Sequence, residues 1–301
     1  MAHTARRTLS ATRSHALQQA LDHFHTSGSR WSLVYKTRPD WPSIPSSDTR
    51  GTVSILDSSF NPPTLAHAAL ASLPTSGTRT SHAHLLVFSV RNADKGRGRP
   101  GDATPLQRLE MMELLAYHLE SQSLNVAIAL VDEPLVFAKA TLFHQHISSH
   151  VPLHLYWIMG SDTLTRVFDP KYYGSEAHLA ESCRRFFEQD TSHILCSERS
   201  DDSVQGTMTA TAPTTVAHSP DVHILLQRPG PAHDWYQRGS IELQSIDPIL
   251  GQCSSTAARR SVLQAYQNDI SRDEQSQILA RIVPPLLVEY IVSHSLYHAR
   301  P

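Results

Sequence analysis

The sequence predicts an α/β fold: a Rossmann-like, doubly wound parallel sheet. Apolar runs alternate along the chain with stretches of helical pattern, which is the order expected of strands joined by crossover helices. Most of these apolar runs lack strict alternation of polar and apolar residues, as is usual for strands covered on both faces. With 301 residues, 40% of them hydrophobic, the chain can bury the core of one large α/β domain or two small ones.

The expected elements follow from these runs and from the caps beside them. Strands are expected at residues 52–56, 84–89, 126–131, 153–160, 193–196 and 223–227. Helices are expected after Thr64, Pro105, Ala138, Thr163, Ala177 and Ser255, and from Pro284 to Ser295. Two segments interrupt the alternation, a basic stretch with glycines near 89–102 and a Ser/Thr/Ala-rich stretch at 200–220, and both are expected to be flexible surface loops.

Residues 1–48 are expected to form an N-terminal tail and helix, ahead of a main domain at 49–301. The arginines Arg6, Arg7 and Arg13 precede the first acidic residue and are accompanied by Ser and Thr, a composition compatible with a mitochondrial presequence. It is equally compatible with a loose tail that leads into a helix over 16–24, which we favour. We therefore expect a cytoplasmic or nuclear protein, with a mitochondrial location left open.

Composition excludes several classes of protein. The net charge of −2, from 26 basic and 28 acidic residues, argues against a bulk electrostatic grip on DNA or RNA. The sequence has no apolar run long enough to predict a membrane span. Cys183, Cys196 and Cys253 are far apart and odd in number, which indicates reduced thiols rather than a disulfide frame. The histidines are scattered, so no protein metal site is predicted.

The first motif that carries chemistry runs from Ser58 to His67. It joins an expected strand to an expected helix through a turn rich in proline, with a histidine in the first helical turn. Backbone N–H groups at a helix start are unpaired and the dipole there favours anions, while an imidazole adds a donor for a phosphoryl oxygen. The segment predicts a phosphate site; the alternative is a proline-rich turn with a surface histidine.

The second motif runs from Ser254 to Arg260. Its hydroxyl residues make good N-caps, and their side chains and exposed N–H groups can face one phosphate. Arg259 lies one turn further on the same side, where its guanidinium could fork onto phosphate oxygens. The alternative is an ordinary capped helix.

Two further motifs lie beside expected strands. Gly160 and Asp162 follow the strand at 153–160, at the carboxyl end where open α/β sheets bind ligands. Gly160 would let a ligand approach closely, and Asp162 would accept a hydrogen bond from a ribose hydroxyl or cap the next helix. Arg228 follows the strand expected at 223–227, where it is either a nucleotide contact or a surface arginine.

Together these motifs resemble those of the nucleotidyltransferase superfamily, and within it the nicotinamide-nucleotide adenylyltransferases, in a divergent fungal branch. The family's first pattern reads roughly Gly-Ser-Phe-Asn-Pro-x-Thr-x-x-His, and its second Ile-Ser-Ser-Thr-x-x-Arg. The residues that match the first are Ser59, Phe60, Asn61, Pro62, Thr64 and His67. The resemblance covers about residues 50–298, including a helix at 104–116 and a Val-Pro-rich C-terminal helix from residue 283.

The resemblance implies a nucleotidyltransferase-type fold and an enzyme that joins ATP and nicotinamide mononucleotide into NAD, releasing pyrophosphate. It assigns His67 to the α-phosphate, and Arg259 to the outgoing pyrophosphate. The implied nucleotide-binding residues are Ser59, Phe60, Asn61, Thr64, Lys95, Gly160, Asp162, Arg228, Ser254, Ser255 and Thr256. Mg²⁺ is expected to bridge phosphate oxygens while largely hydrated, without dedicated protein ligands.

Three departures from the family pattern keep other functions open. Ser58 replaces a glycine whose backbone can take a positive φ, Gly251 to Cys253 replace Asn-Asp-Ile, and Pro134 replaces a tryptophan that stacks on nicotinamide. Phe137 or Trp157 could supply the missing ring. The alternatives are an adenylyltransferase for another phosphate acceptor and a nucleotide-binding regulatory protein without synthetic activity. Oligomeric state is not readable, and every assignment requires the two phosphate motifs to meet in space.

Overall fold

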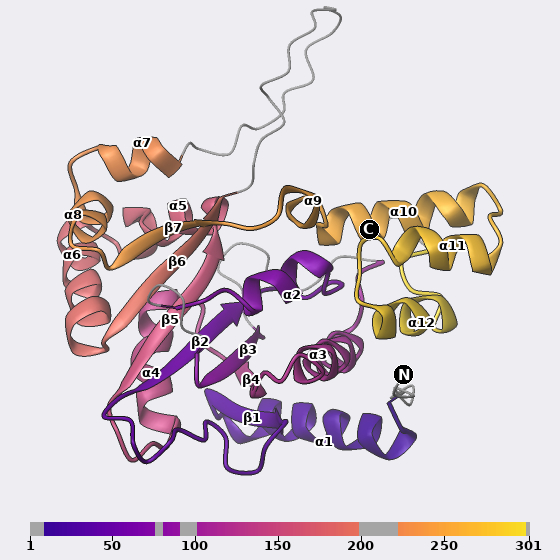
Figure 1. The fold of residues 1–301 in the computed structure, drawn as a ribbon, viewed down its shortest axis with the longest axis horizontal. Helices are drawn as coiled ribbons and strands as arrows, with labels where there is room; N and C mark the ends of the chain where they lie inside the picture. The colour runs from indigo at the N-terminus through magenta and orange to yellow at the C-terminus, as the bar shows by residue number, and fades with distance from the viewer. Residues whose placement is uncertain (1–8, 76–80, 91–100, 199–221, 299–301) are drawn as a thin grey trace, which may run out of the picture.

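A computed structural model describes residues 9–75, 81–90, 101–198 and 222–298. Within these residues the centre of the fold is a seven-stranded sheet in the order β1-β4-β3-β2-β5-β6-β7 (Figure 1). All neighbouring strands are parallel except β1 and β4, which are antiparallel. The strands are β1 Trp31–Lys36, β2 Gly51–Asp57, β3 Ala83–Ser89, β4 Val126–Val131, β5 Leu153–Gly160, β6 Ser192–Glu198 and β7 Ile241–Ser245.

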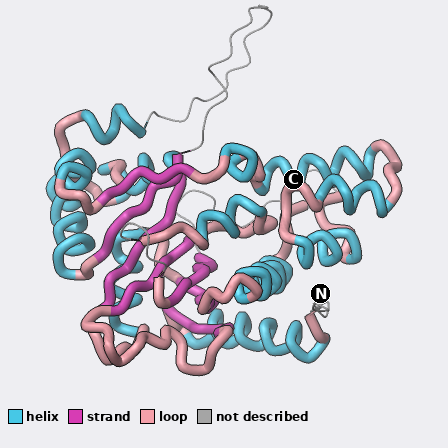
Figure 2. The backbone as a smooth tube through the Cα atoms, in the orientation of Figure 1, coloured by secondary structure: helices cyan, strands magenta, loops and turns pink. Residues whose placement is uncertain are grey.

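Helices cover both faces of the sheet (Figure 2). The helices are α1 Ala11–Ser27, α2 Leu65–Ala71, α3 Pro105–Glu120, α4 Val136–His146, α5 Ser161–Val167, α6 Glu176–Arg184, α7 Val222–Gln227, α8 Pro231–Gln237, α9 Pro248–Gly251, α10 Ser255–Gln267, α11 Arg272–Leu279 and α12 Pro285–Ser293. Helices α1 to α3 pack on one face and α4 to α8 on the other. None of the helices in the described part of the chain combines the length and apolar character that crossing a membrane requires.

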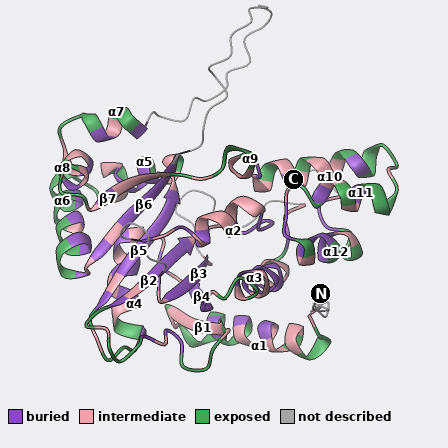
Figure 3. Cartoon of the chain, in the orientation of Figure 1, coloured by how far each residue is buried: buried purple, intermediate pink, exposed green. Residues whose placement is uncertain are grey.

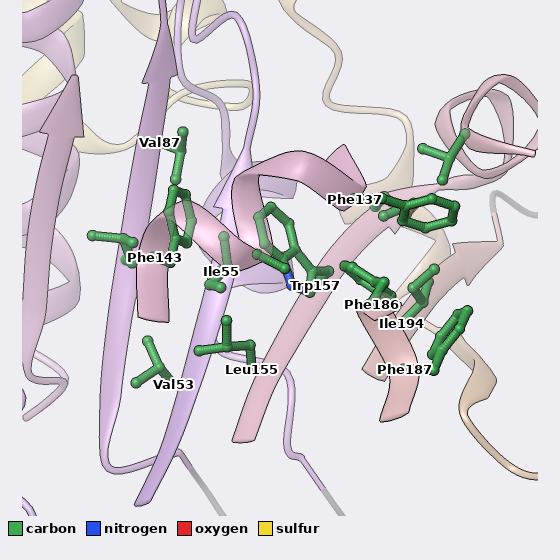
Figure 4. Close-up of a cluster of buried hydrophobic side chains, with 14 of the residues drawn as sticks. Val53, Ile55, Val87, Phe137, Phe143, Leu155, Trp157, Phe186, Phe187 and Ile194 are labelled. Atoms are coloured by element: carbon green, nitrogen blue, oxygen red, sulfur yellow. The ribbon is translucent and has the colours of Figure 1, made fainter. Parts of the chain in front are cut away.

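The two faces of the sheet each have their own apolar core, because side chains alternate along a strand. In β2, Val53 and Ile55 point to the face covered by α4 to α8, and Leu56 points to the other. The central strands are coloured as mostly buried in Figure 3. Aromatic rings fill the first core, where Trp157 stacks on Phe143 with ring centroids 5.1 Å apart (Figure 4). Since both faces are buried, the strands read as continuous apolar runs, as the sequence predicted.

Helix α3 is buried on two faces, one against the sheet and one against the C-terminal helices. Leu109 and Met112 belong to the core on the sheet, whereas Met111 and Leu114 pack against the C-terminal helices α10, α11 and α12. Tyr290 of α12 donates a hydrogen bond to the carboxylate of Glu110 on α3. The C-terminal helices are therefore attached to the sheet through α3.

The order of the strands places a topological switch between β2 and β5. From β2 the chain proceeds to β3 and β4 on one side, and from β5 to β6 and β7 on the other. The carboxyl ends of β2 and β5 lie side by side, with Leu56 paired to Ile158. This is the position at which doubly wound sheets bind ligands, and the predicted doubly wound α/β fold is confirmed.

The strand predicted at 223–227 is wrong, because these residues belong to helix α7. Val222 and Leu226 are buried four residues apart while Ile224 is exposed, which is helical spacing. The place beside β6 is taken by β7, which the sequence analysis missed. Its polar residues Glu242 and Gln244 interrupt the apolar pattern, as is usual for an edge strand.

The N-terminal segment is part of the same sheet. Strand β1 pairs with β4, so the sheet crosses the domain boundary predicted at residues 48 and 49. Helix α1, expected near 16–24, is capped by Ser10 and buries Leu17, Leu21 and Phe24. Of the two predicted loops, the segment 200–220 and most of 89–102 lie outside the described residues.

Arg13 connects α1 to the interior. Its Nε donates to Glu113 of α3 at 2.7 Å, and its Nη2 donates to the carbonyl of Val34 at 2.9 Å. Glu113 is fully buried, and Tyr117 donates to its other oxygen at 2.5 Å. The arginine of the N-terminal segment thus neutralises a carboxylate that has no access to water.

Replacing Arg13 by alanine is expected to lower the free energy of unfolding by about 2 kcal/mol, because Glu113 would be left as a buried charge without a cation. The value is smaller than the roughly 3–5 kcal/mol typical of a fully buried pair, because the Arg13 side chain is 30% exposed. Urea denaturation measures it. Arg184→Ala breaks an ion pair that is more than half exposed on both sides, so it should change stability by less than about 0.5 kcal/mol. Equal effects of the two variants would contradict the assignment.

His84 of β3 makes stability depend on pH. The residue is 2% exposed, and burial lowers its pKa from 6.5 to about 4. The unfolded chain therefore binds a proton at a pH where the native chain does not, and stability falls as the pH drops from 6.5 toward 4, by up to about 3 kcal/mol. His84→Leu should remove this part of the pH dependence in denaturation curves, whereas His25→Leu, at an exposed position, should leave it. Parallel curves for His84→Leu and the unmodified protein would refute the argument.

Candidate active site

The first motif forms the connection between β2 and α2. Thr64 is the N-cap of α2 and His67 lies in its first turn. The backbone N–H of Thr64 donates to His67 Nδ1 at 3.1 Å, and the Thr64 hydroxyl lies 2.9 Å from the same atom. Because a backbone N–H can only donate, Nδ1 is the unprotonated nitrogen, and a neutral imidazole carries its proton on Nε2. Nε2 lies 3.0 Å from the hydroxyl of Ser58.

Phe60 fixes the shape of this loop. Its ring is fully buried in the core of the sheet, 5.4 Å from the His67 ring, and its φ of 45° lies in the left-handed region. That region is unfavourable for a residue with a large side chain, and burial of the ring holds it there. Ser58, which replaces the family's glycine, has no positive φ, so the substitution causes no such strain. Phe60 can offer a nucleotide only its backbone.

Asn61 is a buried connector within the site. Its side chain is 4% exposed, and its Nδ2 donates to Asp102 at 2.7 Å. Its Oδ1 accepts from the N–H of Ala103 at 3.2 Å and from the hydroxyl of Tyr297 at 2.9 Å. These two donors use both lone pairs of the amide oxygen. Asn61 therefore has a structural role, in which it joins the β2 loop to α3 and the C-terminus, and its nucleotide contact stays a prediction.

The second motif lies directly against the first. Ser254 caps α10 by accepting from the N–H of Ala257 at 3.0 Å. The Ser255 hydroxyl donates to the carbonyl of Pro62 at 2.7 Å, and Arg259 Nη1 donates to the carbonyl of Asn61 at 2.6 Å. We call these last two hydrogen bonds the clasp. The requirement that the two motifs meet in space is thus confirmed.

The clasp changes the roles predicted for the second motif. The hydroxyls of Ser254 and Ser255 are bound to protein atoms, so a phosphate would meet their backbone N–H groups rather than their side chains. Thr256 is exposed, and its hydroxyl is 3.4 Å from Arg259 Nη2. Thr256 and Arg259 are therefore the side chains of this motif that remain placed for a phosphate contact.

Arg108 of α3 is a cation that the sequence analysis did not assign to the site. Its Nε donates to the carbonyl of Ala103 at 2.9 Å, and its Nη2 is 3.4 Å from Asp102. Burial lowers the pKa of Arg108, the carboxylate of Asp102 opposes that shift, and the charge of Arg259 adds to it. The two guanidinium groups are thus close enough to interact, and together they favour an anion. The available signal was an arginine one turn after the Thr104 cap.

A buried ion pair closes the carboxyl end of β2. Lys139 of α4, which is 3% exposed, pairs with the carboxylate of Asp57. The Ser89 hydroxyl, at the end of β3, donates to the other oxygen of Asp57 at 3.1 Å. The negative charge of Asp57 is therefore neutralised beside the phosphate motif. Sequence reasoning missed Lys139 because a lysine within a helix is usually solvated.

The third motif lies at the end of the neighbouring strand β5. Gly160 precedes α5, and a side-chain carbon added to it would meet no atom within 4 Å, so protein packing does not fill this space. Asp162 is exposed, and its carboxylate makes no hydrogen bond with the described residues. The alternative role of Asp162 as a helix cap is therefore not observed. Both residues stay predicted ligand contacts.

Three other predictions have different outcomes. Arg228 is exposed after helix α7 and not at the end of a parallel strand, so the strand-based reason for placing it by the nucleotide is wrong. Lys95 lies outside the described residues. Ser59 is half-buried beside Ser58, and its nucleotide contact stays a prediction.

Neither aromatic residue proposed to replace the missing tryptophan can do so in this conformation. Trp157 is 1% exposed and stacks on Phe143, and Phe137 lies 4.6 Å from the ring of Phe186 (Figure 4). Both rings belong to the aromatic core under the sheet. The structure therefore assigns no aromatic side chain of this pair to the acceptor.

Fold and site together define a class: a doubly wound α/β protein in which the two predicted phosphate motifs meet at the topological switch. The chain is similar to a Schizosaccharomyces pombe protein provisionally named nicotinamide mononucleotide adenylyltransferase. The two are 29% identical over 240 residues, which cover 79% of this chain and 83% of the relative. The resemblance found in the sequence is thereby confirmed.

Two other comparisons complete the picture. A solved structure of the Plasmodium falciparum nicotinic acid mononucleotide adenylyltransferase complexed with APC aligns with a TM-score of 0.44 and 16% identity, covering 82% of this chain and 97% of that one. This likeness is too low to support an inference. No protein-family model matches the chain.

The Asn61→Ala variant is expected to lose about 2 kcal/mol of stability, because the carboxylate of Asp102 and the Tyr297 hydroxyl would each lose a buried partner. Denaturation by urea, followed by circular dichroism, measures the loss. Asn268→Ala, at the exposed end of α10, serves as the matched control and should change stability by less than about 0.5 kcal/mol. A stability of Asn61→Ala equal to that of the control would show that the network does not hold the site.

Proposed function

We propose that this protein transfers the adenylyl group of ATP to nicotinamide mononucleotide, forming NAD and releasing pyrophosphate. The clasp carries this proposal, because it brings the imidazole motif and the guanidinium motif to one end of β2. The relative from Schizosaccharomyces pombe supports the same activity by its name. A triphosphate is the ligand whose length and charge suit two phosphate motifs in contact.

The reaction needs no nucleophile from the enzyme. The 5′-phosphate of the mononucleotide is already anionic and can attack the α-phosphorus of ATP in line, so that catalysis consists of positioning and charge stabilisation. His67 belongs at the α-phosphate, where negative charge builds. Arg259, the exposed hydroxyl of Thr256 and the N–H groups at the start of α10 belong at the departing pyrophosphate.

Arg108 adds positive charge to the site without contacting the ligand directly. Its guanidinium is bound to Asp102 and to the Ala103 carbonyl, so it acts on the phosphates through the field that it shares with Arg259. Mg²⁺ is proposed to arrive with the triphosphate and to neutralise its oxygens. In the part of the chain described by the structure, His, Cys, Asp and Glu form no cluster of three or more that could hold a metal.

One observation favours a different acceptor as the second candidate. Pro134 replaces the expected tryptophan, and Phe137 and Trp157 are committed to the core. A phosphate acceptor other than nicotinamide mononucleotide would not need a ring to stack on. Purified protein supplied with ATP, Mg²⁺ and a panel of acceptors decides between them, with pyrophosphate release and product mass as the two readouts.

The proposed function is upheld if NAD forms from nicotinamide mononucleotide faster than any product forms from another acceptor. Pyrophosphate release with another acceptor alone would keep the reaction and change the substrate. ATP binding without pyrophosphate release, at any acceptor concentration, would leave a nucleotide-binding regulatory protein.

His67→Ala is expected to reduce turnover by about 10²-fold, the size typical of removing one donor that stabilises charge in a transition state. The KM for ATP should change much less, because the interaction strengthens as charge develops. His25→Ala, at an exposed position on α1, controls for the loss of an imidazole. Turnover of His67→Ala within a factor of three of the control would remove His67 from the mechanism.

A further inference from the structure

Ser58 occupies the position between the proposed catalytic imidazole and the phosphate-binding edge of the sheet. It is the first residue after β2, is half-buried, and lies beside the neutralised pair of Asp57 and Lys139. Its hydroxyl oxygen is 3.0 Å from His67 Nε2. The family pattern has a glycine here, so this contact is a property of the present chain.

The direction of the contact follows from the other side of the imidazole. The Thr64 N–H donates to Nδ1, which leaves Nε2 as the protonated nitrogen of the neutral ring. Nε2–H therefore donates, and the Ser58 oxygen accepts. A hydroxyl has a single proton, and acceptance of one hydrogen bond leaves that proton available to donate elsewhere.

The described residues offer no acceptor for this proton. Within the part of the chain that the structure describes, the bond to His67 is the single hydrogen bond of the Ser58 hydroxyl. A hydroxyl that accepts a hydrogen bond is also polarised, which makes it a better donor. Ser58 thus presents a strengthened donor that has no acceptor among the described residues, at the end of β2 where the switch of the sheet lies.

Neither backbone geometry nor packing explains the serine. Ser58 has no positive φ, so the residue is not needed to hold an unusual turn. It does not contribute to any of the three apolar clusters. Arg259, which donates to the carbonyl of Asn61 in the same loop, makes an anion the favoured acceptor.

We propose that the Ser58 hydroxyl, held and polarised by His67, donates directly to a non-bridging oxygen of the α-phosphate of the bound nucleotide. His67 then acts on that phosphate through Ser58, with Nε2–H donating to the hydroxyl and the hydroxyl donating to the phosphate. No proton is transferred, and the hydrogen-bonded pair tightens as charge grows on the phosphate. This inference rests on the proposed adenylyl transfer and identifies a catalytic residue that replaces the family's glycine.

Two substitutions test the proposal. Ser58→Ala removes the hydroxyl, and Ser58→Gly restores the residue of the family pattern. Both are expected to lower kcat by about 10- to 100-fold with less change in the KM for nicotinamide mononucleotide. Ser46→Ala, an exposed serine in the loop before β2, is the matched control and should leave kcat unchanged. Full kcat in both Ser58 variants would overturn the proposal.

A phosphorothioate separates contact with the phosphate from a purely structural role. With the two diastereomers of ATPαS, sulfur replaces one or the other non-bridging α-oxygen and weakens it as an acceptor. The unmodified protein should prefer one diastereomer, and Ser58→Ala should lose a large part of that preference. An unchanged preference in Ser58→Ala would show that the hydroxyl does not touch the α-phosphate.

The pair must also behave as a unit. The double variant Ser58→Ala/His67→Ala should be no slower than the slower single variant, because each substitution breaks the same chain of hydrogen bonds. Multiplying losses would show two independent contacts and overturn the relay.

The test remains decisive if the proposed function fails. Should the unmodified protein form no product with any acceptor, titration calorimetry of ATP with Mg²⁺ replaces turnover. Ser58→Ala should then bind ATP about 5-fold more weakly, the value of one hydrogen bond. Unchanged affinity would refute the contact of Ser58, whereas weaker binding would support that contact in a protein without transferase activity.

Discussion

The charge-assisted hydrogen bond from Arg259 to the carbonyl of Asn61 is the contact on which the proposed active site depends. It joins residues almost two hundred positions apart, and the bond from Ser255 to Pro62 lies beside it. This clasp holds the start of α10 against the loop that leads to the imidazole of α2. The side chain of Asn61 holds the same loop in place, because its amide donates to Asp102 and accepts from Ala103 and Tyr297.

Charge is distributed around this clasp in a consistent manner. The cations Arg108 and Arg259 interact with each other, whereas the acidic groups nearby, Asp57 and Asp102, each have a basic partner. Arg108, Arg259 and Lys139 thus outnumber the carboxylates of Asp57 and Asp102 around the clasp, although the whole chain has a slight negative charge. The composition gives only a nearly neutral net charge, whereas the fold shows that the two arginines lie close together.

Local patterns predicted those parts of the structure that local physics determines. The central strands and the helix starts at Pro105 and Ser255 follow from apolar runs and caps. The meeting of the two motifs was instead required by the family resemblance. Residues 222–227 were misjudged because a short apolar run fits a strand and a buried helix equally well. The tertiary roles of Arg108 and Lys139 could not be predicted, since they depend on neighbours distant in sequence. The same is true of the structural role of Asn61, whose motif position indicated only a ligand contact.

The bond between Asn61 and Tyr297 has a consequence for how the protein matures. The loop after β2 is synthesised early. Its partners, the hydroxyl of Tyr297 and the guanidinium of Arg259, belong to about the last fifty residues of the chain. Until the C-terminal helices have docked on α3, the nascent polypeptide contains the sheet but not the clasp that joins the two motifs. If the protein has the proposed function, nucleotide stabilises the completed chain and not the partly synthesised one.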